Sequence, residues 1–102
     1  MSYRFEVFGW RDGEVQDVAA KVNRTLFIEL EPRSSLYRGE YYRWRGAGAA
    51  DIILQENFIE EDDGLRTDDE FPDHVVLLYA SNLPRPWFAR IAGIDGAERL
   101  SS

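Results

Sequence analysis

The chemically most active side chains of this sequence are carboxylates, and they are concentrated in one segment. Residues 56–73, ENFIEEDDGLRTDDEFPD, hold nine of the nineteen acidic residues and one of the twelve basic ones. This acidic segment has a charge of −8, whereas the rest of the chain, with ten acids and eleven bases, is close to neutral. Clustered carboxylates can bind a metal ion, act as an acid–base pair or attract a cationic partner.

A calcium-binding loop is the first possibility. If Gly64 takes the sixth position of an EF-hand loop, Glu61, Asp63 and Glu70 fall at the third, fifth and twelfth positions. The first position is then Ile59, whose side chain cannot ligate a cation. The flanking residues also have strand patterns where an EF-hand has helices. We therefore expect no metal site and no cofactor.

A catalytic site would require a nucleophile or a base in a recognisable setting. His74 is the single histidine and Asp73 precedes it, so a general base oriented by a carboxylate is one interpretation. No nucleophile motif accompanies this pair, because the serines lack a GxSxG setting and the glycines form no phosphate-binding loop. We interpret His74 as the first residue of a strand and expect that the protein is not an enzyme.

Residues 37–45, YRGEYYRWR, alternate aromatic and arginine side chains as a nucleic-acid stacking strand does. The acidic segment begins about a dozen residues later, within a Debye length of about 10 Å, and would repel phosphates. The same pattern is typical of an ordinary strand whose aromatic rings enter the core while its arginines reach solvent. We therefore expect no nucleic-acid ligand.

Periodicity predicts the elements that position these residues. Alternating apolar residues indicate strands, and Val15, Val18, Ala19 and Val22 form one apolar helical stripe after a possible N-cap at Asp12. The predicted order is a strand at 3–10, a helix from 15, a strand at 25–31 ended by Pro32, strands at 36–45 and 50–58 around a turn at 46–48, a strand at 75–80, a helix at 84–91 and a poorly ordered tail at 94–102.

This order predicts an α+β fold: a mostly antiparallel sheet, β-α-β-β-β-β-α, with the helices packed on one face. The 102 residues suit a single domain with an ordered core at about 3–92, in which the first β-α-β unit would pair its strands in parallel. The sequence has no cysteine, no apolar run of about 18 residues and no signal-peptide pattern. We expect a cytoplasmic protein without a membrane partner.

The acidic segment is then best interpreted as a protein-binding loop between two strands. Apolar residues alternate with its acids, so a basic protein would be attracted by charge and retained by apolar contacts. The predicted contact residues are Phe58, Glu60, Glu61, Asp62, Asp63, Leu65, Asp68, Asp69, Glu70 and Phe71.

Several stretches together resemble a known kind of protein: FEVFGW near the start, YRGEYYRW at 37–44, ILQENF at 53–58, the DDG acidic loop and FPDHVVLLYAS at 71–81. Up to about Asn82 the chain is similar to small acidic bacterial immunity proteins of polymorphic-toxin and contact-dependent inhibition systems. The resemblance implies a cytoplasmic inhibitor that covers the active site of a cognate toxin, often a nuclease with a basic groove.

An alternative hypothesis is a small regulatory or structural domain without catalytic activity. It would self-associate through Tyr42, Trp44 and a free strand edge, and the acidic segment would only keep it soluble. The expected oligomeric state is a monomer or a weak homodimer.

Overall fold

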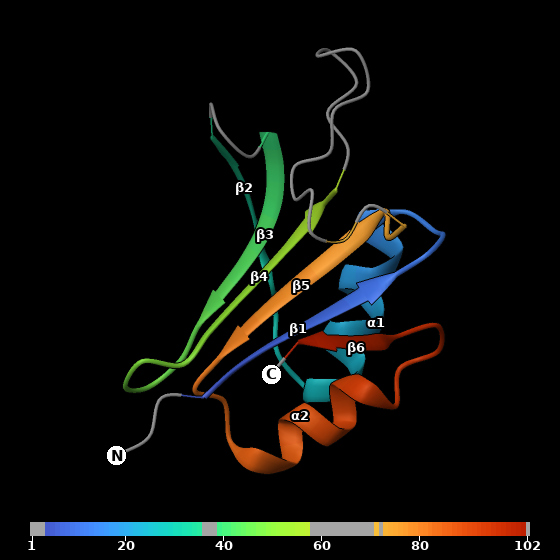
Figure 1. The fold of residues 1–102 in the computed structure, drawn as a ribbon. Helices are drawn as coiled ribbons and strands as arrows, with labels where there is room; N and C mark the ends of the chain where they lie inside the picture. The colour runs from blue at the N-terminus through green and yellow to red at the C-terminus, as the bar shows by residue number, and fades with distance from the viewer. Residues whose placement is uncertain (1–3, 36–38, 58–70, 72, 102) are drawn as a thin grey trace.

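The computed structural model describes residues 4–35, 39–57, 71 and 73–101. This part of the chain forms a six-stranded sheet and two helices, in the order β1 (Phe5–Trp10), α1 (Val15–Leu26), β2 (Glu31–Ser35), β3 (Gly39–Arg45), β4 (Asp51–Glu56), β5 (Val76–Ser81), α2 (Arg85–Ala92) and β6 (Glu98–Ser101). The strands lie in the order β2-β3-β4-β5-β1-β6, and each neighbouring pair is antiparallel (Figure 1). The predicted α+β fold is confirmed.

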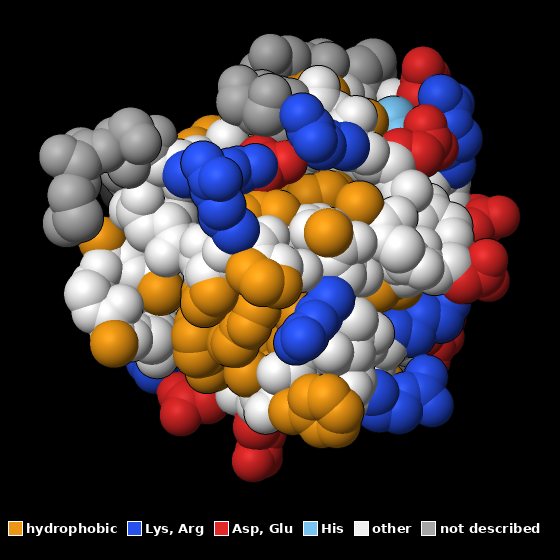
Figure 2. Space-filling model, turned by 90° about the horizontal axis from the view of Figure 1, so that it is seen from below, with side chains coloured by type: hydrophobic (Ala, Val, Ile, Leu, Met, Phe, Trp, Pro, Cys, Tyr) orange, Lys and Arg blue, Asp and Glu red, His pale blue; other side chains and the backbone are white. Residues whose placement is uncertain are grey.

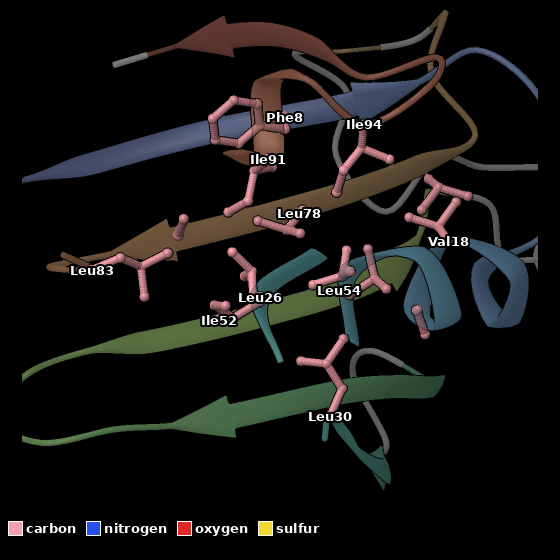
Figure 3. Packing of buried hydrophobic residues seen from close by; sticks show 14 of the residues in the cluster. Phe8, Val18, Leu26, Leu30, Ile52, Leu54, Leu78, Leu83, Ile91 and Ile94 are labelled. Carbon is pink, nitrogen blue, oxygen red and sulfur yellow. The ribbon is translucent and has the colours of Figure 1, made fainter. Parts of the chain in front are cut away.

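Both helices cover one face of the sheet, and the hydrophobic core lies between them and the strands (Figure 1). Phe8, Leu78 and Leu54 stand opposite one another on β1, β5 and β4, and all three side chains are fully buried. They share one cluster with Val18 of α1 and Ile91 of α2 (Figure 3). Alternate residues of each strand therefore face the helices, as the period of two requires.

Helix α1 follows its predicted apolar stripe, and every residue of that stripe is buried. Asp17 lies in the first turn and Arg24 in the last, which suits the helix dipole. The prediction that Asp12 caps the helix is wrong. The N-cap is Glu14, which makes no side-chain capping bond, because Gly13 at φ 100° turns the chain between Asp12 and the helix.

The predicted strand at 25–31 is also wrong. Leu26 extends the buried stripe one turn beyond Val22, so α1 continues to Leu26 and ends at Phe27 in the left-handed conformation. Strand β2 begins only at Glu31 and includes Pro32, which was expected to end a strand. A proline is tolerated there because β2 is the edge strand and one side of it needs no ladder bonds.

The first two strands do not pair in parallel, contrary to the prediction. Strand β1 lies between β5 and β6 and is antiparallel to both, while three strands separate it from β2. Helix α1 therefore carries the chain from β1, next to one edge of the sheet, to β2 at the opposite edge. The apolar run at 75–80 becomes β5, a central strand between β4 and β1.

The prediction of a poorly ordered tail at 94–102 is wrong as well. Ile94 is buried, the indole Nε1 of Trp10 donates a hydrogen bond to the Asp95 carbonyl at 3.1 Å, and β6 pairs with β1. Arg99 of β6 lies 3.2 Å from the buried carboxylate of Glu6, which Arg4 also contacts at 3.1 Å. Strand β6 thus covers an edge of β1 that would otherwise be open.

Candidate functional site

The acidic segment leaves the sheet at the end of β4 and returns at the start of β5, and a buried asparagine joins the two ends. The Asn57 amide Nδ2 donates to the carbonyls of Phe71 at 2.8 Å and of His74 at 3.0 Å. The Asn57 backbone N–H donates to the Val75 carbonyl at 2.8 Å. We call Asn57, Phe71, His74 and Val75 the base of the acidic segment. Because Asn57 is fully buried, its bond to the His74 carbonyl is shielded from water, while the bond to Phe71 is partly shielded.

His74 packs the base against the sheet. Its ring is buried against Gly9, where an added Cβ would lie 2.9 Å from the ring carbon Cδ2 and 2.7 Å from Leu100 Cδ1. The Nε2 atom lies 3.5 Å from the Glu98 carboxylate. Only glycine on β1 leaves room for this ring. A buried ring of this kind suits a packing role better than proton transfer to a substrate.

Besides its contact with His74, Glu98 also binds Arg11, the residue that follows β1. Arg11 Nε donates to the Glu98 carboxylate at 2.9 Å. Desolvation by itself would raise the pKa of Glu98, but the Arg11 hydrogen bond, the Arg11 charge and the contact with His74 outweigh it and lower that pKa below its ordinary value near 4.5. The carboxylate is therefore ionised at neutral pH and contributes to the negative field beside the base.

Most of the predicted contact residues lie outside the described part of the chain: Phe58, Glu60, Glu61, Asp62, Asp63, Leu65, Asp68, Asp69 and Glu70. The described member of the set is Phe71, which is half-buried and whose carbonyl accepts the Asn57 bond. The residues of the calcium-loop alignment, 59, 61, 63, 64 and 70, also lie outside the described part of the chain. Among the described residues, no group of three or more His, Asp or Glu is placed to hold a metal ion.

Six carboxylates from other parts of the chain lie around the base, together with Glu56 and Asp73 at the two ends of the segment itself. The register brings the C-terminal ends of β1 and β4 together with the N-terminal ends of β3, β5 and β6, and α1 also starts there. We call this the acidic end, and its carboxylates are those of Asp12, Glu14, Asp17, Glu40, Glu56, Asp73, Asp95 and Glu98. The described bases nearby are Arg11, Arg33 and Arg99, which are paired with Glu98, Glu31 and Glu6. The field of the acidic segment is therefore reinforced by the folded domain.

The aromatic–arginine strand is β3, and its two faces separate the side chains that a stacking platform would combine. Tyr42 and Trp44 pack against the core on the helix side, where the Trp44 ring lies 5.1 Å from that of Trp87. Arg43 lies on the opposite face and makes two bonds to the Asp51 carboxylate, at 3.1 and 2.9 Å, which raise the Arg43 pKa.

The edge of the sheet on this side is β2, not the aromatic strand. Strand β3 is paired with β2 over Gly39–Arg43 and with β4 over Tyr41–Arg45. The free edge that the self-association hypothesis placed on the aromatic strand is thus limited to its last two residues.

Comparison of the chain with protein-family models, with curated proteins and with solved structures finds no match. Within the described residues, neither helix combines the length and the apolar character that a membrane span requires.

Proposed function

We propose that the protein is a non-enzymatic inhibitor that binds and neutralises a basic partner, a cognate bacterial toxin, through the acidic segment. The observation that carries the proposal is the fixed base: Asn57 ties both ends of the segment into the buried sheet. A loop whose ends are fixed loses less conformational entropy on binding than a free tail of the same length. The segment is thus presented by a rigid domain.

The charge of the folded domain supports the same conclusion. Six carboxylates from other parts of the chain lie at the end of the sheet where the segment follows β4 and precedes β5. A toxin with a basic groove would be attracted over a distance of about 10 Å at 0.1 M salt and oriented toward this end. The apolar residues among the acids would then exclude water from the contact.

The test is a titration of the protein with the product of the neighbouring gene at several salt concentrations. Charge reversal in the segment, Asp62→Lys with Asp63→Lys, should slow association about tenfold or more and reduce its dependence on salt. The control is Glu29→Lys, a charge reversal at an exposed residue outside the acidic end, compared with Asp62→Lys alone. Equal association rates for these two single variants would contradict the proposal.

A further inference from the structure

Phe27 has an unusual position for a large apolar residue. Its side chain is 89% exposed, and among the described residues it is the one large hydrophobic side chain that is exposed. Its backbone, at φ 56° and ψ 46°, occupies the left-handed region that ends α1, where glycine or asparagine is normally found. The Asn23 carbonyl accepts from Ile28 N–H at 3.2 Å and Asn23 Oδ1 accepts from Leu30 N–H at 2.9 Å, so this turn is well defined.

The surface around the end of α1 is basic. The exposed arginines there come from the start of β1, the last turn of α1, the end of β3 and helix α2, and we call them the basic end: Arg4, Arg24, Arg45, Arg85 and Arg90. Among the described acids near this end, Asp51 is paired with Arg43, Glu6 with Arg4 and Glu31 with Arg33, while Glu29 is exposed. Figure 2 shows hydrophobic side chains gathered on this side of the molecule with Lys and Arg side chains beside them.

A groove at the opposite, acidic end has complementary chemistry. It has a volume of about 360 Å³ and lies between the first turn of α1 and strands β2 and β3. Val15, Pro32 and Tyr42 give it an apolar lining, and the carboxylates of Glu40 and Glu56 also border it. Arg33 lines it as well, but its charge is paired with Glu31 at 2.7 Å. Such a groove suits an aromatic side chain next to a cation.

The groove and Phe27 cannot meet within one molecule. Val15 and Phe27 stand at opposite ends of the twelve-residue helix α1, about 18 Å apart along its axis. We infer that the protein self-associates head to tail: Phe27 of one copy enters the groove of the next, and Arg24 lies against Glu40 and Glu56. Two basic ends facing each other would repel, so charge favours this arrangement over a symmetric dimer.

A contact between two different surfaces of the same chain does not close on itself. It leaves one free groove and one free Phe27 in every dimer, so further copies can add in a line. The inference does not depend on the proposed function, because the contact uses Phe27, Arg24 and the groove and none of residues 58–70.

Sedimentation velocity over a concentration series at low salt tests the contact. The wild-type mass should rise with concentration at about 0.02 M salt and return to the monomer at about 1 M, where the Debye length is about 3 Å. Phe27→Asn should remain monomeric. Its melting temperature should be unchanged or higher, because asparagine adopts the left-handed conformation more readily than phenylalanine. Loss of association in this variant would therefore not reflect unfolding.

A mixing experiment distinguishes the head-to-tail contact from a symmetric one. Glu40→Lys with Glu56→Lys should also be monomeric, but an equimolar mixture with Phe27→Asn should form 1:1 dimers, since one variant retains the groove and the other retains Phe27. The control Glu29→Lys, a charge reversal at an exposed residue that does not line the groove, should associate like the wild type or more strongly. A monomeric wild type at about 1 mM, an associating Phe27→Asn, or a mixture that stays monomeric would each overturn the inference.

Discussion

The base of the acidic segment makes a quantitative prediction about Asn57. In Asn57→Ala the carbonyls of Phe71 and His74 lose the Nδ2 donor, at 2.8 and 3.0 Å; the bond to His74 is buried and the bond to Phe71 is partly buried. The Phe71 carbonyl keeps a second bond from the His74 N–H at 3.3 Å, so the His74 carbonyl loses more. An unsatisfied buried acceptor costs about 1–3 kcal/mol, and we expect a loss of about 2 kcal/mol in the free energy of unfolding.

Urea denaturation measures this loss, and thermal unfolding should show a melting temperature lower by about 10 °C for a domain of this size. The control is Asn23→Ala, which removes one side-chain bond to a backbone N–H, at 2.9 Å, in a half-buried position away from the segment. Amide exchange at Val75 should accelerate in Asn57→Ala and not in Asn23→Ala. A change of less than about 0.5 kcal/mol in Asn57→Ala would refute the reasoning.

The other predictions concern the contacts that pack around the base. Gly9→Ala places a Cβ 2.7 Å from Leu100 Cδ1 and should reduce the free energy of unfolding by about 1–3 kcal/mol, whereas Gly93→Ala, with its nearest atom at 3.6 Å, should be close to neutral in the same urea assay. Glu98 has a lowered pKa in the folded state, so its stabilising contribution is present above about pH 4.5 and is lost as the pH falls through the folded-state pKa. Unfolding measured between pH 3 and 7 should show this loss in the wild type and a shallower decline in Glu98→Gln.

Local sequence patterns predicted an element correctly where a single apolar period, helical or strand-like, ran through the whole element. The helical stripe from Val15 predicted α1, and the apolar run at 75–80 predicted the strand that is β5. They were insufficient at Thr25–Glu31, because an alternating apolar pattern of a few residues fits the last turn of a helix as well as a strand. The tail was missed for a related reason: Glu98 and Arg99 lack an apolar pattern, and their strand exists because β1 offers an unpaired edge.

The candidate site, like the fold, was only partly predictable from the sequence. The charge count located the acidic segment without any structure, but nothing local marks Asn57 as the residue that joins its ends, since its two acceptors lie 14 and 17 residues further along the chain. The groove beside Glu40 and Glu56 was likewise not predicted, because its lining comes from α1, β2, β3 and β4.

The sequence by itself therefore determined the fold class, the charge asymmetry and the position of the acidic segment, since each follows from composition or from a short period. Only the tertiary structure decided which strands are neighbours, which carboxylates surround the base of the segment, and that Phe27 stands exposed at the basic end. These depend on where distant parts of the chain meet, and that is set by the packing of both helices on one face of the sheet.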